Sequence, residues 1–201
     1  MPFIDLKTQY KKIEEKIKNR IHTILEHGQY IMGPEVKELE TNLSTFVGAK
    51  HSIGCASGTD ALMLAMLALD IKAGDEVIVP DFTFFGTAEV VSLLGATPVF
   101  VDIDPDTYNL DPVKAKAAIT DKTKAIMPVS LYGLTADMEA FMEIAQDKNI
   151  AIIEDGAQSF GASYKVEGKT KTSCNVAPIS TTSFYPAKPL GAYGDAGAVF
   201  T

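Results

Sequence analysis

The stretch that decides the fold is IAIIED, residues 150–155, in which four apolar residues lead directly into two carboxylates. A short, continuous apolar run is typical of a strand that is buried on both faces of a parallel sheet. Similar runs occur on either side of it along the chain. The predicted strands are HSIGCA (51–56), EVIVP (76–80), TPVFVDI (97–103), KAIMPVS (124–130), IAIIED (150–155), STTSF (180–184) and AGAVFT (196–201).

Helical patterns separate these strands. They are predicted over residues 60–69, 87–94, 112–119 and 138–148. Strands that alternate with helices indicate βαβ units, so we expect an α/β fold with a mostly parallel sheet and helices on both faces.

Two further helices are expected ahead of the first strand. The first covers residues 10–25, where isoleucines at helical spacing predict a core or dimer contact, and the second begins at Pro34 and ends before Gly48. No repeat or linker interrupts the sequence. We therefore expect one domain, with N-terminal helices over about 1–48 and an α/β core over about 49–201. The chain stops at Thr201 inside a predicted strand, which suggests a fragment.

Composition excludes several classes of protein. The net charge of −8 and the pI of about 4.9 argue against nucleic acids and anionic membranes as partners. The start of the chain lacks the pattern of a signal peptide, and no stretch has the length of a membrane span, so we expect a cytoplasmic protein with reduced thiols. The three histidines are isolated, and the two cysteines have no zinc-type spacing, so no metal site is predicted.

A first candidate ligand site lies in CASGTDALML, residues 55–64, where a strand ends, a turn follows and a helix begins. The backbone N–H groups at a helix N-terminus, together with hydroxyl groups, can bind phosphate. Ser57, Gly58 and Thr59 would supply these donors. The alternative is an ordinary helix N-cap.

The next predicted strand end is followed by PDFTFFGTAE, residues 80–89. Its phenylalanines are Phe82, Phe84 and Phe85. Core packing would account for at least one of them, and a ring on the ligand side could stack on a flat heterocycle.

Asp155 lies at the end of the IAIIED run. A buried carboxylate is costly unless it is paired, so a cationic partner at the sheet edge would explain it. The alternative is an aspartate that caps the following turn.

Lys188 lies in TTSFYPAKPLGAYGDAG, residues 181–197, which has few polar neighbours to solvate it. Desolvation disfavours the charged form of lysine, and a neutral amine is a nucleophile toward aldehydes. The alternative is a side chain that extends out of a glycine-rich loop into solvent.

Together these groups fit one cofactor, pyridoxal 5'-phosphate. Lys188 would condense with its aldehyde, Asp155 would keep the pyridine nitrogen protonated, and Phe84 would cover the ring. The phosphate cradle would consist of Ser57, Gly58, Thr59 and Ser183.

The chain closely resembles the nucleotide-sugar aminotransferases of the DegT/DnrJ/EryC1/StrS family. The stretches that carry this resemblance are ASGTDAL (56–62), VFVDIDPDTYNLDP (99–112), KAIMPVSLYG (124–133), IIEDGAQSFGA (152–162) and TSFYPAKPLGAYGDAGAVFT (182–201). The resemblance implies a fold-type I, aspartate-aminotransferase-like large domain. It also implies a homodimer with shared active sites, glutamate as amino donor, a nucleotide-sugar substrate and pyridoxamine 5'-phosphate as the intermediate form of the cofactor.

The resemblance also implies roles for single residues. Lys188 would be the cofactor-binding lysine and proton shuttle, and Asp155 would pair with the pyridine nitrogen. Gln158 would face the ring near its 3-hydroxyl, and Phe84 would stack on it. The phosphate would be bound by Gly58, Thr59 and Ser183. Some relatives have histidine in place of the lysine and dehydrate sugars, and Lys188 argues against that activity.

Family members continue for about as much chain again, which forms a small domain that this chain lacks. Within the family, IDLKTQY, HGQYIMGPEV and DPDTYNLDP are most similar to enzymes that aminate C3 of a UDP-2-acetamido-2-deoxy-3-keto-hexuronic acid for O-antigen synthesis. The alternative substrate is a 4-keto or 3-keto deoxysugar on UDP or dTDP.

Two other classes of protein fit the sequence less well. A non-catalytic regulatory or binding protein on the same fold would be indicated by loss of Lys188 or Asp155, and both are present. A nucleotide-binding Rossmann protein would need G-x-G-x-x-G, which GCASGTD lacks. Arg20 is the single arginine, so we expect most recognition of substrate anions to come from the missing C-terminal part or a second subunit.

Overall fold

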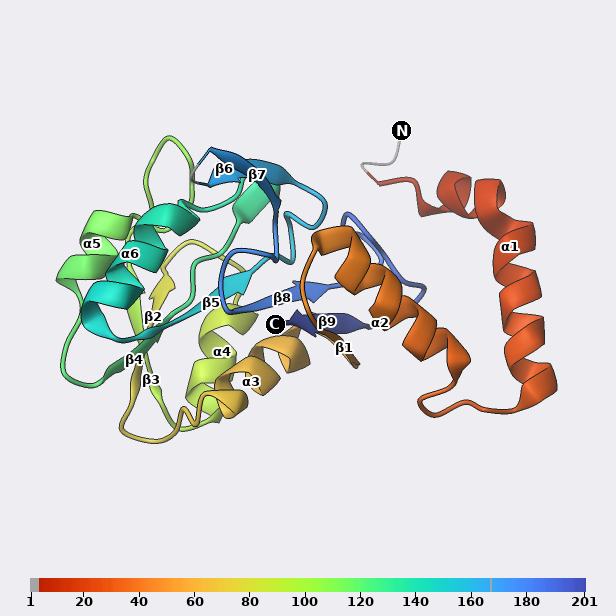
Figure 1. Ribbon diagram of the computed structural model, residues 1–201, viewed down its shortest axis with the longest axis horizontal. Helices are drawn as coiled ribbons and strands as arrows, with labels where there is room; N and C mark the ends of the chain where they lie inside the picture. The colour runs from red at the N-terminus through yellow and green to blue at the C-terminus, as the bar shows by residue number, and fades with distance from the viewer. Residues whose placement is uncertain (1–3, 167) are drawn as a thin grey trace.

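Seven strands form one twisted sheet in the order β1-β9-β8-β5-β4-β2-β3 (Figure 1). The computed structural model describes residues 4–166 and 168–201. The strands of this sheet are β1 (Ser52–Cys55), β2 (Glu76–Pro80), β3 (Thr97–Val101), β4 (Thr123–Ile126), β5 (Ala151–Asp155), β8 (Ile179–Ser183) and β9 (Gly197–Phe200). β9 runs antiparallel to both of its neighbours, and the other pairings are parallel. The predicted fold class is confirmed.

Helices cover both faces of the sheet, as the apolar runs predicted. On β2, Val77 and Val79 pack into a cluster with α3 (Gly58–Ala68) and α4 (Gly86–Leu93). Ile78 lies between them in sequence and packs on the opposite face with α5 (Pro112–Ala117) and α6 (Met138–Lys148). Because successive side chains of a strand point to opposite faces, a strand such as β2 that is covered on both faces has apolar residues at successive positions.

The two N-terminal helices differ in how they attach to the rest of the chain. α2 (Pro34–Val47) buries Leu43 and Val47 against the face of the sheet near β9. α1 (Leu6–His27) buries no side chain and stands apart from the sheet (Figure 1). The interpretation of its isoleucines as core is therefore wrong within this chain, and their role in a dimer contact stays a prediction.

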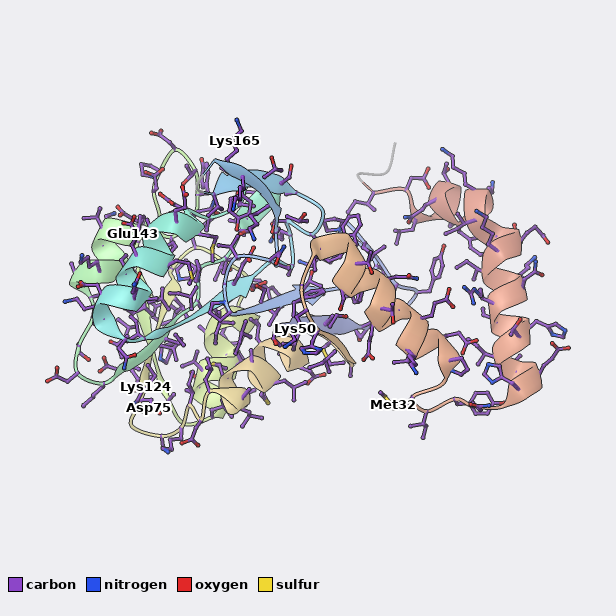
Figure 2. All side chains as sticks on the ribbon, in the orientation of Figure 1. Met32, Lys50, Asp75, Lys124, Glu143 and Lys165 are labelled. Atoms are coloured by element: carbon purple, nitrogen blue, oxygen red, sulfur yellow. The ribbon has the colours of Figure 1, made fainter. Side chains whose placement is uncertain are left out.

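Polar and aromatic contacts, together with the connecting turn, hold α1 to its surroundings. Arg20 pairs with Glu38 at 2.5 Å, and the rings of Tyr10 and Tyr193 meet edge to face with centroids 5.9 Å apart. Met32 lies in the turn that joins α1 to α2 and is 72% exposed (Figure 2).

Three features depart from the predicted elements. The hairpin of β6 (Ser163–Val166) and β7 (Lys169–Thr172) and the short 3-10 helix η1 (Leu131–Gly133) were not predicted. β1 and β3 were predicted to be buried strands but lie at the two edges of the sheet, where Ile53 is 50% and Phe100 is 58% exposed. Among the described residues, no helix combines the length and apolar character needed to cross a membrane.

Candidate active site

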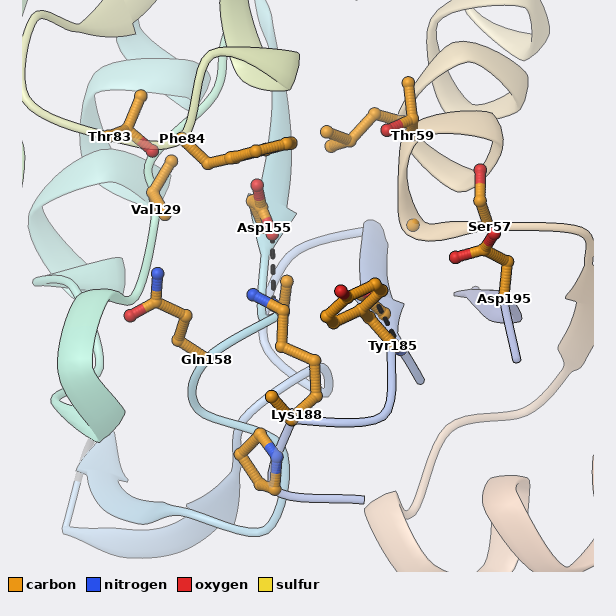
Figure 3. Close-up of a pocket in the computed structure, with 16 residues that line it drawn as sticks. Ser57, Thr59, Thr83, Phe84, Val129, Asp155, Gln158, Tyr185, Lys188 and Asp195 are labelled. Carbon is orange, nitrogen blue, oxygen red and sulfur yellow. Dashed lines mark hydrogen bonds between the residues drawn. The ribbon is translucent and has the colours of Figure 1, made fainter. Parts of the chain in front are cut away.

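A cavity of about 830 Å³ opens at the carboxyl ends of the parallel strands (Figure 3). All eight predicted site residues line it, although they come from four separate parts of the chain. The lining residues are Ser57, Gly58, Thr59, Leu62, Thr83, Phe84, Val129, Asp155, Ala157, Gln158, Ser183, Tyr185, Ala187, Lys188, Pro189 and Asp195. Ligands of open parallel sheets bind at this edge, so the position of the cavity follows from the topology.

The Ser57 side chain acts as the N-cap of α3. Its hydroxyl oxygen accepts a hydrogen bond from the Asp60 N–H at 3.0 Å, and its hydroxyl donates to Asp60 Oδ2 at 3.0 Å. Both functions of this hydroxyl are therefore used within the helix turn. The alternative of an ordinary N-cap is therefore correct for the Ser57 side chain. The backbone N–H groups of Gly58 and Thr59 can still donate to an anion, because the first N–H groups of a helix lack intrahelical acceptors.

Gly58 lies against Ser183 at the end of β8. A Cβ atom at position 58 would lie 2.5 Å from Ser183 Cβ, so a side chain there would have to displace β8 or the helix start. The Ser183 Oγ accepts the Tyr185 N–H at 3.2 Å, which leaves its hydroxyl proton free to point toward the cavity. The N-terminus of α3 and this hydroxyl together form a concave group of donors that suits a phosphate.

Asp155 is 6% exposed at the end of β5. Burial raises the pKa of its carboxyl above the ordinary value. The Ala157 N–H, which donates to Oδ1 at 3.0 Å, the charge of Lys188 and the hydroxyl of Thr87 lower that pKa in part. The Asp155 carboxyl thus faces the cationic Lys188 across the cavity and also accepts a hydrogen bond from the following turn. Both alternatives from the sequence, a cationic partner and a turn cap, therefore apply to it.

Lys188 approaches Asp155 from the opposite wall. A turn in which the Lys188 N–H donates to the Tyr185 carbonyl at 2.8 Å presents the side chain, which is half-buried. Figure 3 shows its amine directed into the cavity toward Asp155. The side chain therefore does not extend into bulk solvent.

Phe84 forms the upper wall of the cavity, and its ring extends over the space between Asp155 and Thr59 (Figure 3). Core packing was expected for at least one of the three phenylalanines, but Phe82, Phe84 and Phe85 are 45%, 66% and 72% exposed. The prediction of core packing is wrong because these residues follow β2 on a surface turn. Phe84 is the one of the three that lines the cavity.

Gln158 is held by the loop that follows β4. Its Oε1 accepts the Tyr132 N–H at 2.9 Å, so the amide nitrogen remains available to a group in the cavity. Tyr132 has a left-handed backbone with φ 53°. Asn109 ties this loop to the one after β3, because it accepts the Leu131 N–H at 3.0 Å and donates to the Leu134 carbonyl at 3.1 Å.

Several lining and supporting residues were not predicted from the sequence. Thr83, Tyr185 and Asp195 line the cavity, and Thr87 is fully buried beside Asp155, with its Oγ1 3.3 Å from that of Thr83. Thr83 lies in the turn after β2 and Thr87 in the first turn of α4, and the available signal was two threonines close together after a predicted strand.

Residues 11–201 match the DegT/DnrJ/EryC1/StrS aminotransferase family. The chain belongs to this family. The sequence predicted a role in cofactor binding for eight residues of the cavity lining, which are Ser57, Gly58, Thr59, Phe84, Asp155, Gln158, Ser183 and Lys188.

Relatives of this DegT/DnrJ/EryC1/StrS family member include two sugar aminotransferases. The UDP-2-acetamido-2-deoxy-3-oxo-D-glucuronate aminotransferase of Pseudomonas aeruginosa is 60% identical over 99% of this chain and 54% of its own length. The UDP-N-acetyl-3-dehydro-α-D-glucosamine 3-aminotransferase of Acidithiobacillus ferrooxidans is 46% identical over 100% of this chain and 53% of its own. A pleiotropic regulatory protein of Geobacillus stearothermophilus is also 46% identical, over the same shares.

Solved structures of the family superpose closely on this one. A DegT DnrJ EryC1 StrS aminotransferase from Brucella abortus has a TM-score of 0.95 at 45% identity, over 100% of this chain and 55% of that one. NtdA from Bacillus subtilis with bound cofactor PMP has a TM-score of 0.91 at 38% identity, over 100% of this chain and 45% of that one. The chain therefore spans about half the length of the relatives that it matches.

Proposed function

We propose that the protein of which this chain forms the cofactor-binding part is a pyridoxal 5'-phosphate-dependent aminotransferase, which moves an amino group from glutamate to a keto-sugar nucleotide. The observation that carries this proposal is the position of Lys188, whose amine faces Asp155 across a cavity that Phe84 covers. Membership of an aminotransferase family supports it, as does the bound PMP of the Bacillus subtilis relative.

The residues of the cavity fit the cofactor in size and in chemistry. The N–H groups of Gly58 and Thr59 and the Ser183 hydroxyl would bind the phosphate at one end. Asp155 would hold a proton at the pyridine nitrogen, and Phe84 would pack on the ring. When bound, the cofactor supplies a carbonyl carbon that takes up the amino group and a ring that stabilises negative charge.

The chain itself would bind, orient and move protons. Lys188 would attach to the cofactor through its amine and, once released, would carry a proton between the substrate carbon and the cofactor. Asp155 lies on a strand end rather than a mobile loop, so its carboxyl would keep a fixed direction. Gln158, held through its Oε1 by the Tyr132 N–H, would direct its amide nitrogen to the ring.

For the substrate, we propose C3 of a UDP-2-acetamido-2-deoxy-3-keto-hexuronic acid, whose amination would serve O-antigen synthesis. The names of the Pseudomonas and Acidithiobacillus relatives support a 3-keto sugar on UDP. Arg20 is paired with Glu38 on α1, and Lys188 is the single cationic residue in the cavity lining of the described chain. We therefore propose that a second subunit and further chain supply the groups that bind the substrate's anions, in a cytoplasmic homodimer.

The cofactor assignment is tested by adding pyridoxal 5'-phosphate to the 201-residue chain. We expect visible absorbance that borohydride abolishes, and a mass increase on the peptide that contains Lys188. Lys188→Ala should prevent both. An unchanged spectrum of the wild-type chain, or a modified peptide elsewhere, would contradict the assignment.

The substrate assignment needs a separate assay. The whole protein is incubated with glutamate and either the UDP-3-keto-hexuronic acid, a UDP-linked keto-deoxysugar or a dTDP-linked one, and the product is identified by mass. Amination of the uronic acid alone supports the proposal. Preference for a deoxysugar identifies the alternative substrate, and bound cofactor without any amination would favour a regulatory role, as in the name of the Geobacillus relative.

A further inference from the structure

Glu154 is a fully buried carboxylate that points away from the cavity. Its relative exposure is 0%, and both of its oxygens accept hydrogen bonds. The Ser173 hydroxyl donates to Oε1 at 2.9 Å, the Cys174 N–H donates to both oxygens at 3.1 Å, and the Ser180 hydroxyl donates to Oε2 at 3.2 Å. Three separate residues are therefore held by one side chain.

No cation compensates this carboxylate among the residues that the structure describes. Burial raises the pKa of Glu154, the charge of Asp155 raises it further, and the three donors lower it in part. Beside it lies Tyr164, whose buried hydroxyl has no hydrogen-bond partner among the described residues. Because a buried acid without a cation is costly, the presence of Glu154 at the end of β5 indicates a role beyond packing.

The residues that Glu154 holds press directly on the backbone next to Asp155. A Cβ atom on Gly156 would lie 2.4 Å from Cys174 Sγ and 3.1 Å from Ser173 Oγ, so the segment 173–174 sits where any side chain at position 156 would be. Gly156 connects Asp155 to Ala157, whose N–H donates to Asp155 Oδ1 at 3.0 Å. The contacts thus run from Glu154 through residues 173–174 to the bond that orients the Asp155 carboxyl.

The same backbone is fixed from β8. The Gly156 N–H donates to the Thr181 carbonyl at 2.8 Å, and the Thr182 hydroxyl donates to the Gly156 carbonyl at 3.2 Å. Glu154 joins this arrangement through Ser180, and β8 ends at Ser183, which lines the cavity. Glu154 therefore lies behind both strand ends that we propose to contact the cofactor.

We propose that Glu154 is a positioning residue for Asp155: by fastening residues 173–174 and Ser180 behind the sheet, it fixes the turn 155–157 and hence the direction of the Asp155 carboxyl. This inference rests on the proposed function for its consequence in the cofactor site, while its structural part can be measured on the chain alone.

The first test needs no cofactor. Amide hydrogen exchange of Ala157 is compared with that of Met127, whose N–H donates to the Ile78 carbonyl in the sheet core. Glu154→Leu removes every acceptor, and we expect Ala157 to exchange about tenfold faster relative to Met127. Glu154→Gln keeps one acceptor oxygen and the same shape, and should restore most of the protection.

The second test measures the dissociation constant of pyridoxal 5'-phosphate by absorbance titration. We expect Glu154→Leu to weaken binding by about tenfold and to alter the pH dependence of the visible band, and Glu154→Gln to stay within about threefold of wild type. Two controls accompany it. Tyr164→Phe removes the unpartnered hydroxyl beside Glu154, and Phe141→Leu disturbs a fully buried residue in the cluster of α6; both should bind as wild type.

The outcomes separate the two proposals. If Ala157 in Glu154→Leu is protected from exchange as well as in wild type, the positioning role is overturned. It is also overturned if Phe141→Leu lowers the protection of Ala157 relative to Met127 by the same factor as Glu154→Leu does. A wild-type chain that binds no cofactor contradicts the proposed function instead, and the exchange measurement still decides the role of Glu154.

Discussion

Gly58 at the start of α3 and Ser183 at the end of β8 are packed so closely that a Cβ atom on Gly58 would lie 2.5 Å from Ser183 Cβ and 3.0 Å from its Oγ. The two residues are 125 positions apart in the sequence (183 minus 58). Their contact joins the N–H groups of a helix to a hydroxyl on a strand. The N–H groups at the start of α3 and the Ser183 hydroxyl, which we propose to bind the phosphate, can lie this close only because residue 58 is a glycine.

Gly58→Ala should lower both stability and cofactor affinity. The added methyl group overlaps Ser183, and such overpacking destabilises by about 1–3 kcal/mol. Denaturant unfolding and a cofactor titration measure the two effects. Gly194→Ala is the control, because nothing lies within 4 Å of a Cβ atom there. Equal behaviour of the two variants would contradict the steric explanation.

Asp155→Asn should change how stability depends on pH. Burial raises the pKa of Asp155, so the folded chain holds this proton more tightly than the unfolded chain does. The contribution of the carboxyl to stability is therefore present at low pH and is lost as the pH rises through the folded pKa. We measure the free energy of unfolding of both proteins without cofactor from about pH 4 to about pH 8. The value for the variant minus the value for wild type should increase as the pH rises. A constant difference between the two would show that burial does not control this carboxyl.

Phe84→Ala should weaken cofactor binding without affecting the fold. The ring is 66% exposed and lines the cavity, so its loss removes stacking that is worth about threefold to tenfold in affinity. Phe85→Ala is a matched control, since Phe85 is 72% exposed and does not line the cavity. Titration of both variants, with thermal unfolding alongside, checks this prediction. Comparable weakening in the control would remove the special role of Phe84.

Asn109→Ala should destabilise the chain by about 1–3 kcal/mol, because it leaves the Leu131 N–H and the Leu134 carbonyl without their partner. Asn109 is 4% exposed. Asn42→Ala, an exposed position on α2, should change stability by less than about 0.5 kcal/mol. Denaturant unfolding measures both, and similar values would contradict the bridging role of Asn109.

The sequence predicted β2 and β5 well because these strands are buried on both faces and are mostly apolar. It also predicted β8, although the buried residues Ser180, Thr181 and Thr182 of that strand are polar. The same reasoning failed for β3, whose Phe100 faces solvent at the sheet edge. It also failed for the hairpin of β6 and β7, whose sequence SYKVEGKTKT is rich in lysine and threonine and has no apolar run. Hairpins that are held by backbone pairing and a glycine turn leave little apolar pattern to detect.

The candidate site was predictable where a residue type is unusual for its place in the fold. Asp155 and Lys188 could be predicted because a charge in apolar surroundings is costly unless it has a function or a partner. Glu154 lies beside Asp155 in the same run, yet its hydrogen-bond donors come from residues 173–180, and a sequence does not show that these fold back behind β5. Contacts between distant segments were the part that the sequence could not supply.

The order of the strands has a consequence for how the chain assembles. β1 is an outer strand of the sheet, and its neighbour there is β9, which comes latest in the sequence among the strands of this sheet that the structure describes. During translation, the backbone N–H and C=O groups of residues 52–55 have no strand partner until residues 197–200 have left the ribosome. Until then these groups can pair with strands of other chains. A chain that is released before residue 197 would therefore be prone to aggregation, even though the clusters that join α3 and α4 and that join α5 and α6 to the sheet are already complete.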